Sequence, residues 1–183
     1  MFADLGWMAE PWPGLEHVIV TASAAGYRAD GQLIMAEDEL VTVRYQLRCD
    51  AGWRFTGLDI SVTGAAGHRD LAVSADGAGS WTAGGQPRPD LSGCTDIDIN
   101  CTPLTNTLPI RRLGLLKAET GVSHRISAAW VLLPSLEVVQ ADQIYTSLGD
   151  NRVRYASETF SADLTVDDEG FVVDYPGLAH LVR

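Results

Sequence analysis

A short stretch in the middle of the chain, Leu91–Leu113, concentrates the side chains that could do chemistry: two carboxylates, an arginine pair and two of the three cysteines. Asp96 and Asp98 alternate with Ile97 and Ile99, which predicts a half-buried strand with both acids on one face and both isoleucines toward the core. Two such carboxylates can serve as general acid and general base where burial separates their pKa values. The same alternation is also typical of a strand whose polar face is solvated.

The remaining motifs argue against metal or cofactor chemistry. Asp96-x-Asp98-x-Asn100 resembles the start of a calcium-binding loop, but the sixth and twelfth positions, which need glycine and an acid, hold Cys101 and Thr107. The four histidines have no metal-ligand spacing, and the chain has neither a Gly-x-Ser-x-Gly elbow nor a phosphate-binding loop. We therefore expect no metal and no cofactor.

Prolines and arginines follow the acidic pair. Pro103 and Pro109 bracket a Thr-Asn-Thr segment. Because proline removes a backbone donor and favours extended geometry before it, we predict a long, rigid, non-helical connection. Arg111 and Arg112 would then alternate along an extended segment and face opposite sides. One of them could pair with an aspartate of the same stretch, or grip an anionic ligand group in a two-pronged contact.

Further candidates come from the first half of the chain. Arg44, Arg48 and Arg54 lie on the polar side of neighbouring predicted strands. If that side is the concave face of a bent sheet, they form a positive patch suited to a phosphate or carboxylate headgroup, and if it is convex they are solvated. The chain also has five tryptophans, whose rings could stack on sugars, pack on acyl chains or fill the core. Trp53 and Trp81 are the two that enter the candidate site.

The elements that must position these residues are short β-strands. The clearest runs from Val41 to Leu47, where apolar and polar residues alternate strictly. The strand Trp53–Gly64 changes phase at Gly57, which indicates a β-bulge that bends and twists the sheet. Asp30-Gly31 is typical of a tight hairpin turn, and so is Asp76–Gly79.

The second half of the chain continues this pattern. Its strand-like segments are separated by Pro, Gly-Asp-Asn and Asp-Asp-Glu-Gly turns, and they span Arg125–Leu133, Leu136–Tyr145, Val153–Ala156, Phe160–Val166 and Phe171–Tyr175. Helical spacing is hard to find. The sequence therefore predicts an all-β fold, a curved antiparallel sheet that forms a half-barrel or a spiral β-roll.

Length and charge limit the possible functions. A chain of 183 residues fits a single domain spanning 1–183, whose core needs neither a disulfide nor a metal. The net charge of -11 argues against nucleic acid as a partner. Three cysteines without ligand spacing, no recognisable secretory leader and no apolar run of bilayer length favour a soluble, cytoplasmic protein with no stable membrane insertion.

The central stretch resembles a bacterial family named "Putative glycolipid-binding", formerly a domain of unknown function. The resemblance rests on Gly93-Cys94-x-Asp96-x-Asp98 and on Thr102-Pro103-x-Thr105-Asn106-Thr107-Leu108-Pro109-Ile110-Arg111-Arg112-Leu113. Flanking matches are Glu16-His17, Tyr45, Trp53, Asp76-Gly77-x-Gly79-x-Trp81, Gln143-x-Tyr145, Asp167 and Gly170-Phe171-Val172-x-Asp174-Tyr175-Pro176-Gly177-Leu178. Leu104 stands where the family would have an aromatic residue, and Trp130 where it would have tyrosine.

What the resemblance implies is a rolled sheet similar in shape to periplasmic lipoprotein carriers, with a cavity for a lipid or glycolipid. The leading hypothesis is a non-enzymatic protein that holds a small amphiphile in a concave, partly apolar cavity with arginines at its mouth. The predicted ligand-binding residues are Arg44, Arg48, Trp53, Arg54, Trp81, Asp96, Asp98, Asn106, Arg111 and Arg112.

Two other functional classes stay open at this point. The chain could be an enzyme that acts on a sugar or lipid derivative, with Asp96 or Asp98 as acid or base. It could also be an interaction protein that uses an exposed sheet edge or a self-complementary face. The sequence leaves the oligomeric state, the ligand and the physiological role undetermined.

Overall fold

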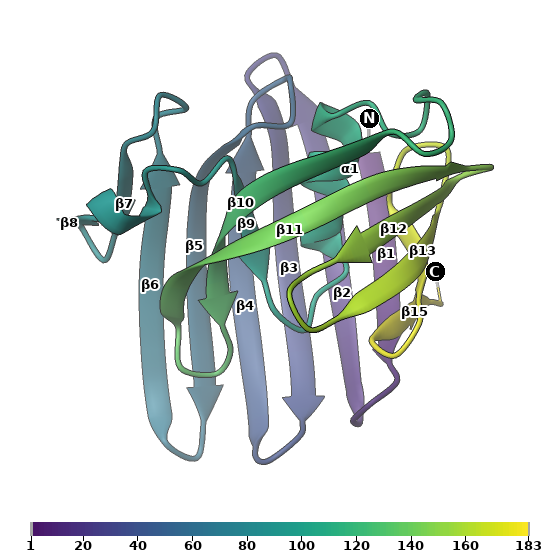
Figure 1. Ribbon diagram of the computed structural model, residues 1–183. Coiled ribbons are helices and arrows are strands. Elements are labelled where there is room, and N and C mark those ends of the chain that lie inside the picture. Colours follow the sequence, from purple (N-terminus) through teal and green to yellow (C-terminus); the bar gives the residue numbers. More distant parts are fainter. Residues whose placement is uncertain (1, 183) are drawn as a thin grey trace.

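A computed structural model describes residues 2–182, and nearly all of its regular structure is β-strand (Figure 1). The strands are β1 (Phe2–Ala9), β2 (Gly14–Ser23), β3 (Gly26–Ala36), β4 (Leu40–Cys49), β5 (Phe55–Gly64), β6 (Gly67–Ala75), β7 (Trp81–Ala83), β8 (Gln86–Pro87), β9 (Asp96–Ile99), β10 (Ser123–Leu132), β11 (Glu137–Gly149), β12 (Arg152–Ala156), β13 (Ser161–Val166), β14 (Val172–Tyr175) and β15 (Ala179–Leu181). The helical elements are the 3₁₀ turns η1 (Pro89–Leu91) and η2 (Leu104–Asn106) and the short helix α1 (Thr107–Arg112).

All fifteen strands belong to one continuous open sheet, in the order β8-β7-β6-β5-β4-β3-β2-β1-β15-β14-β13-β12-β11-β10-β9. Neighbours are antiparallel except β9 and β10, which are parallel and joined through η2 and α1. Figure 1 shows β1–β6 as one layer, with β10–β13 crossing its face and α1 between the two. The predicted all-β curved sheet is confirmed, and its form is a spiral that stays open at β8 and β9.

Winding the sheet over itself creates two hydrophobic clusters that share α1. Ile97 and Ile99 of β9 join the large cluster formed with β1–β7, which confirms that both isoleucines face the core. Ile126 of β10 instead belongs to a second cluster, inside the roll, with residues of β11–β14. The helix contributes Leu108 to the first cluster and Ile110 to the second, so α1 fills the closed part of the roll.

Several strand predictions are confirmed in detail. In β4 the odd-numbered residues from Val41 to Cys49 are buried, and the residues between them are exposed or half-buried. The pairing of β4 with β5 shifts register where Arg48 lies opposite Gly57 and Cys49 lies opposite Phe55. This irregularity is the bulge that the phase change at Gly57 predicts.

The predicted hairpin turn at Asp30-Gly31 is wrong, because both residues lie in the middle of β3. The chain instead turns between Ser23 and Gly26. Gly31 is required for a different reason: it pairs with Tyr45, whose ring covers it so closely that any Cβ there would overlap the ring. Asp-Gly thus marks a close approach of a side chain to the backbone, one of the known uses of glycine in strands.

The predicted non-helical connection is also wrong, because Leu104–Asn106 form a 3₁₀ turn and Thr107–Arg112 form α1. Pro103 precedes the 3₁₀ turn, and Pro109 is the third residue of α1. In the first turn of a helix the backbone N–H has no intrahelical partner, so proline costs nothing there. The two prolines therefore lie where a helix tolerates them.

We expect Gly31→Ala to lower the free energy of unfolding by about 2 kcal/mol or more, because Tyr45 is buried and cannot move aside without losing its hydrogen bond to Glu16. Chemical denaturation would measure the change. Gly6→Ala is the matched control within the same sheet, since a Cβ there makes only ordinary contacts, the nearest 3.6 Å from Val182. Equal stabilities for the two variants would contradict this account of Gly31.

Candidate functional site

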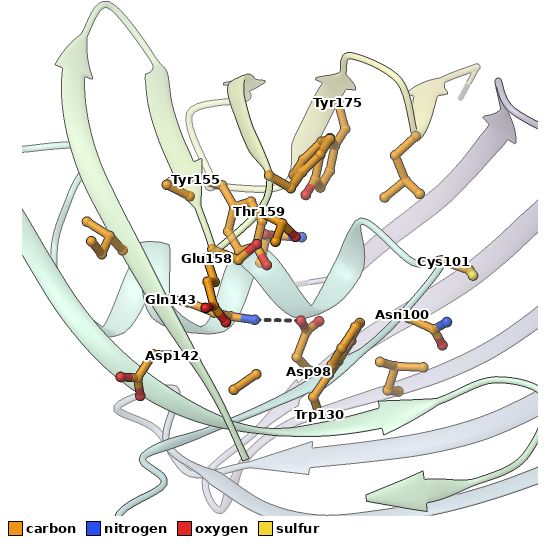
Figure 2. A pocket seen from close by; sticks show the side chains of 18 of the residues that line it. Asp98, Asn100, Cys101, Trp130, Asp142, Gln143, Tyr155, Glu158, Thr159 and Tyr175 are labelled. Carbon is orange, nitrogen blue, oxygen red and sulfur yellow. Dashed lines mark hydrogen bonds between the residues drawn. The ribbon is translucent and has the colours of Figure 1, made fainter. Parts of the chain in front are cut away.

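The described residues form a large hollow, a cavity of about 990 Å³ at the end of the roll that α1 does not fill. Its opening follows from strand pairing. Strand β11 pairs with β12 only from Ile144 onward, where Ile144 lies opposite Ala156. Residues 139–143 of β11 therefore diverge from the turn between β12 and β13, and the cavity lies in the gap (Figure 2).

Asp98 forms the polar floor of this cavity (Figure 2). One carboxylate oxygen accepts a hydrogen bond of 2.8 Å from the Thr105 hydroxyl, and the other accepts one of 2.6 Å from the Gln143 side-chain amide. Burial raises the pKa of Asp98, and these two donors oppose the rise. Over the described residues no Arg, Lys or His forms an ion pair with it, so neutral donors alone stabilise its charge.

Aromatic rings form the walls. Tyr155, Phe160 and Tyr175 pack together, with ring centroids 6.1–6.2 Å apart, and Phe160 is 44% exposed at the opening. Trp130 lies across from them, next to Asp98, its neighbour in the parallel β9–β10 pair (Figure 2). Aromatic faces on two sides of a polar floor can pack on an acyl chain or on the apolar face of a sugar ring.

Asp96 points to the same side of β9 as Asp98, but it lies at the closed end of the roll. It is 1% exposed, and Arg112 holds both of its oxygens, at 3.1 and 2.5 Å. The Thr95 hydroxyl donates a further bond of 2.7 Å. The prediction that one arginine of the pair binds an aspartate of the central stretch is therefore confirmed, although the two arginines lie on a helix.

Arg111 turns away from Asp96. It forms an ion pair of 2.9 Å with the Glu169 carboxylate, donates to the Glu169 backbone carbonyl, and lies over the Trp53 ring at 4.6 Å. The predicted alternation of Arg111 and Arg112 along an extended segment is wrong, because they occupy successive positions of α1. Both guanidinium groups are engaged by acidic residues of the chain.

The other predicted site residues lie away from the cavity. Arg44 and Arg48 are on the outer, convex face of the sheet, where Arg44 donates to Gln32 and Arg48 pairs with Asp59 at 2.7 Å. Arg54 is exposed beside the turn after β4. The positive patch on a concave face is therefore absent from residues 2–182.

The two candidate tryptophans are core residues. Trp53 is 6% exposed and stacks on Tyr27, and Trp81 is 4% exposed and stacks on Phe55. Of the predicted set, only Asp98 and Asn106 line the cavity. None of the arginines in the predicted set lies at the opening of the cavity.

Sequence reasoning missed most of the lining. Gln143 and Tyr175 are among the residues that carry the family resemblance, so that signal could have placed them in the site. Trp130 is one of the five tryptophans that could stack on a ligand, and it also departs from the family pattern, but it is not in the predicted set. Tyr155 carried no signal, because its place beside the cavity depends on how β12 packs on the rest of the roll.

A second buried acid lies behind the cavity wall. Glu16 of β2 accepts a hydrogen bond of 2.6 Å from the Tyr45 hydroxyl and one of 2.6 Å from the hydroxyl of Thr102, a residue that lines the cavity. Burial raises the pKa of Glu16 to about 7, and the two hydroxyl donors only partly oppose this. The cluster ties two strands of the first layer to the loop after β9.

Removing Arg112 should destabilise the fold strongly, because it would leave the buried carboxylate of Asp96 without its cationic partner. We expect Arg112→Ala to lower the free energy of unfolding by about 3 kcal/mol or more. Arg154→Ala is the matched control, since Arg154 also contacts both oxygens of an aspartate, Asp163, but both side chains are exposed, so little change is expected. Similar losses in the two variants would argue against a special role for the buried pair.

The raised pKa of Glu16 predicts a pH dependence of stability. Between pH 4.5, the ordinary pKa, and about pH 7, the pKa in the fold, Glu16 is protonated in the folded protein and ionised in the unfolded chain. Its contribution to stability therefore falls as pH rises through that window. Wild type should lose this contribution as pH rises, and Glu16→Gln should not. We therefore expect the free energy of unfolding of Glu16→Gln, relative to that of wild type, to rise by about 3 kcal/mol between pH 4.5 and pH 8 in denaturant unfolding. Parallel pH profiles for the two proteins would contradict this.

Comparisons with known proteins agree with the fold and with the resemblance. The model of the family described as "Putative glycolipid-binding" matches residues 4–180. A crystal structure of a DUF1089 family protein from Pseudomonas aeruginosa is 35% identical, with a TM-score of 0.83 over 93% of each chain. No match was found among curated proteins. Because the family match covers almost the whole chain, the protein belongs to the "Putative glycolipid-binding" family.

Proposed function

We propose that the protein binds an amphiphile, a lipid or glycolipid, in the cavity at the open end of the roll. The observation that carries this proposal is the cavity of about 990 Å³, which joins a carboxylate and amide floor to aromatic walls. Small-molecule sites commonly have volumes of roughly 300–1,000 Å³ and combine apolar walls with a few placed polar groups. The family name supports a binding role of this kind.

The arrangement of the lining fits a ligand with two unlike ends. Asp98 and Gln143 can hydrogen-bond a headgroup, and Val139, Ala141 and Leu178 add apolar surface to the aromatic walls. The cavity opens between β11 and the turn from β12 to β13, where the ring of Phe160 is exposed. A ligand could therefore enter without a large change of the sheet.

The geometry favours binding over the alternative of acid–base catalysis by the two aspartates. Asp96 is held by Arg112 and does not line the cavity, so the two aspartates do not converge on a common ligand as this mechanism requires. Interaction through a sheet edge gains little support, because the outermost strands β8 and β9 have only two and four residues.

Filling the cavity should abolish binding. Ala141 lines it from the inner side of β11, so Ala141→Trp should occupy the space, whereas Ala72→Trp adds the same ring to the exposed face of β6. We expect wild type and Ala72→Trp to bind the uncharged fluorophore N-phenyl-1-naphthylamine, and Ala141→Trp to bind it at least about tenfold more weakly. Native mass spectrometry should likewise show a co-purified amphiphile on wild type that is lost from Ala141→Trp.

The fluorescence titration decides between two outcomes. Equal affinities for wild type and Ala141→Trp, with both variants folded by circular dichroism, would place the bound apolar molecule elsewhere and contradict the proposal. The same holds if wild type binds none of the probe.

A further inference from the structure

The cavity that we propose as the ligand site has more negative than positive charge around it. Asp98 and Glu158 present carboxylates to it, whereas the carboxylate of Asp142 points away from it (Figure 2), and the one arginine among its lining residues is Arg125. Arg125 is already paired with Asp142 at 3.3 Å, and the lining has neither lysine nor histidine. An anionic headgroup would therefore meet uncompensated negative charge at the floor.

The arginines that could have received an anion are committed elsewhere. Arg112 holds both oxygens of Asp96, and Arg111 is divided between Glu169 and the ring of Trp53. Neither lines the cavity. Recruiting either arginine to a phosphate or sulfate would break its pair, which would leave a carboxylate without its partner.

Asp98 retains acceptor capacity toward the cavity. Thr105 and Gln143 each occupy one of its oxygens, but an ionised carboxylate offers about four acceptor positions. The side chain is half-buried and faces the space between Trp130 and Gln143 (Figure 2). A ligand group that donates hydrogen bonds can reach it without displacing its protein partners.

We infer that Asp98 determines which headgroup the site accepts: groups that donate hydrogen bonds and carry no negative charge, whether a sugar hydroxyl or an ammonium, are admitted, and phosphate and sulfate are rejected. This inference rests on the proposed function, because it concerns the polar end of the same ligand. It reverses the expectation from the sequence alone, in which paired arginines recognise an anion. Specificity here comes from repulsion of the wrong ligand as much as from attraction of the right one.

The test compares three probes that share an octyl chain and differ in headgroup: octyl glucoside, octylammonium and octyl sulfate. Each is titrated by calorimetry below its critical micelle concentration and at one ionic strength. We expect wild type to bind octyl sulfate at least about tenfold more weakly than the tighter of the other two. Tighter glucoside binding would indicate a hydroxylated headgroup, and tighter octylammonium binding an amine.

Asp98→Asn keeps the shape of the side chain and removes its charge, so it should reduce this discrimination to about threefold or less. Asp59→Asn removes the same charge from the outer face of the sheet and should keep the wild-type ratio. Discrimination that survives in Asp98→Asn would overturn the role of Asp98. If Asp98→Asn does not fold, the wild-type ranking still decides.

The two proposals fail differently in this experiment. If wild type binds octyl sulfate as tightly as the other probes, the inference about charge is wrong and the proposed binding function stands. If wild type binds none of the three, the proposed function fails, and the inference falls with it.

Discussion

The structure depends on one constraint: a sheet that winds over itself must bury both faces of its inner strands. The β9–β10 pair meets this constraint with Ile97 and Ile99 packed on the first layer and Asp96 and Asp98 turned into the roll. Carboxylates in such a place need partners, because an unpaired buried charge is costly. The segment from Thr102 to Arg112 supplies one for each acid, Arg112 for Asp96 and Thr105 for Asp98, and it also fills the closed end of the roll with α1.

Two neighbouring acids on one strand face thereby acquire different roles. Asp96, at the end closed by α1, is neutralised by Arg112 and serves the fold. Asp98, two residues along the strand, is stabilised only by neutral donors and faces the cavity. The difference comes from what faces each acid: α1 reaches Asp96 with the Arg112 guanidinium, and the 3₁₀ turn η2 reaches Asp98 with the Thr105 hydroxyl. A carboxylate that the fold does not neutralise is what makes the open end selective.

The sequence predicts the features that depend on neighbouring residues of one strand, and it fails where a feature depends on contacts between distant residues. Alternation in β4 and the phase change at Gly57 are properties of single strands, and both predictions are confirmed. The prediction of a turn at Gly31 is wrong because glycine is needed there to make room for the ring of Tyr45, and the sequence alone does not place that ring. Pro103 and Pro109 were misread because proline is equally compatible with the first turn of a helix.

The candidate site shows the same division more sharply. The pairing of an arginine with Asp96 was predictable because both residues lie in one stretch, whereas the cavity is built from strands that meet only when the sheet rolls up. Arg44 and Arg48 were proposed as lining on a condition that sequence could not test, namely which face of the sheet is concave. The aromatic walls come from three separate strands: Trp130 from β10, Tyr155 from β12 and Tyr175 from β14. No local sequence pattern predicts that these side chains meet.

We propose that the ligand binds in the space between Asp98 and the aromatic walls. The most direct measurement is a ¹H–¹⁵N NMR titration of the protein with octyl glucoside, observing backbone amides together with the Trp130 indole and the Gln143 side-chain amide. The account predicts that the shifts concentrate on these two groups and on the amides around Asp98 and Phe160. Shifts confined to the outer face of β1–β6, or none at saturating probe, would contradict it.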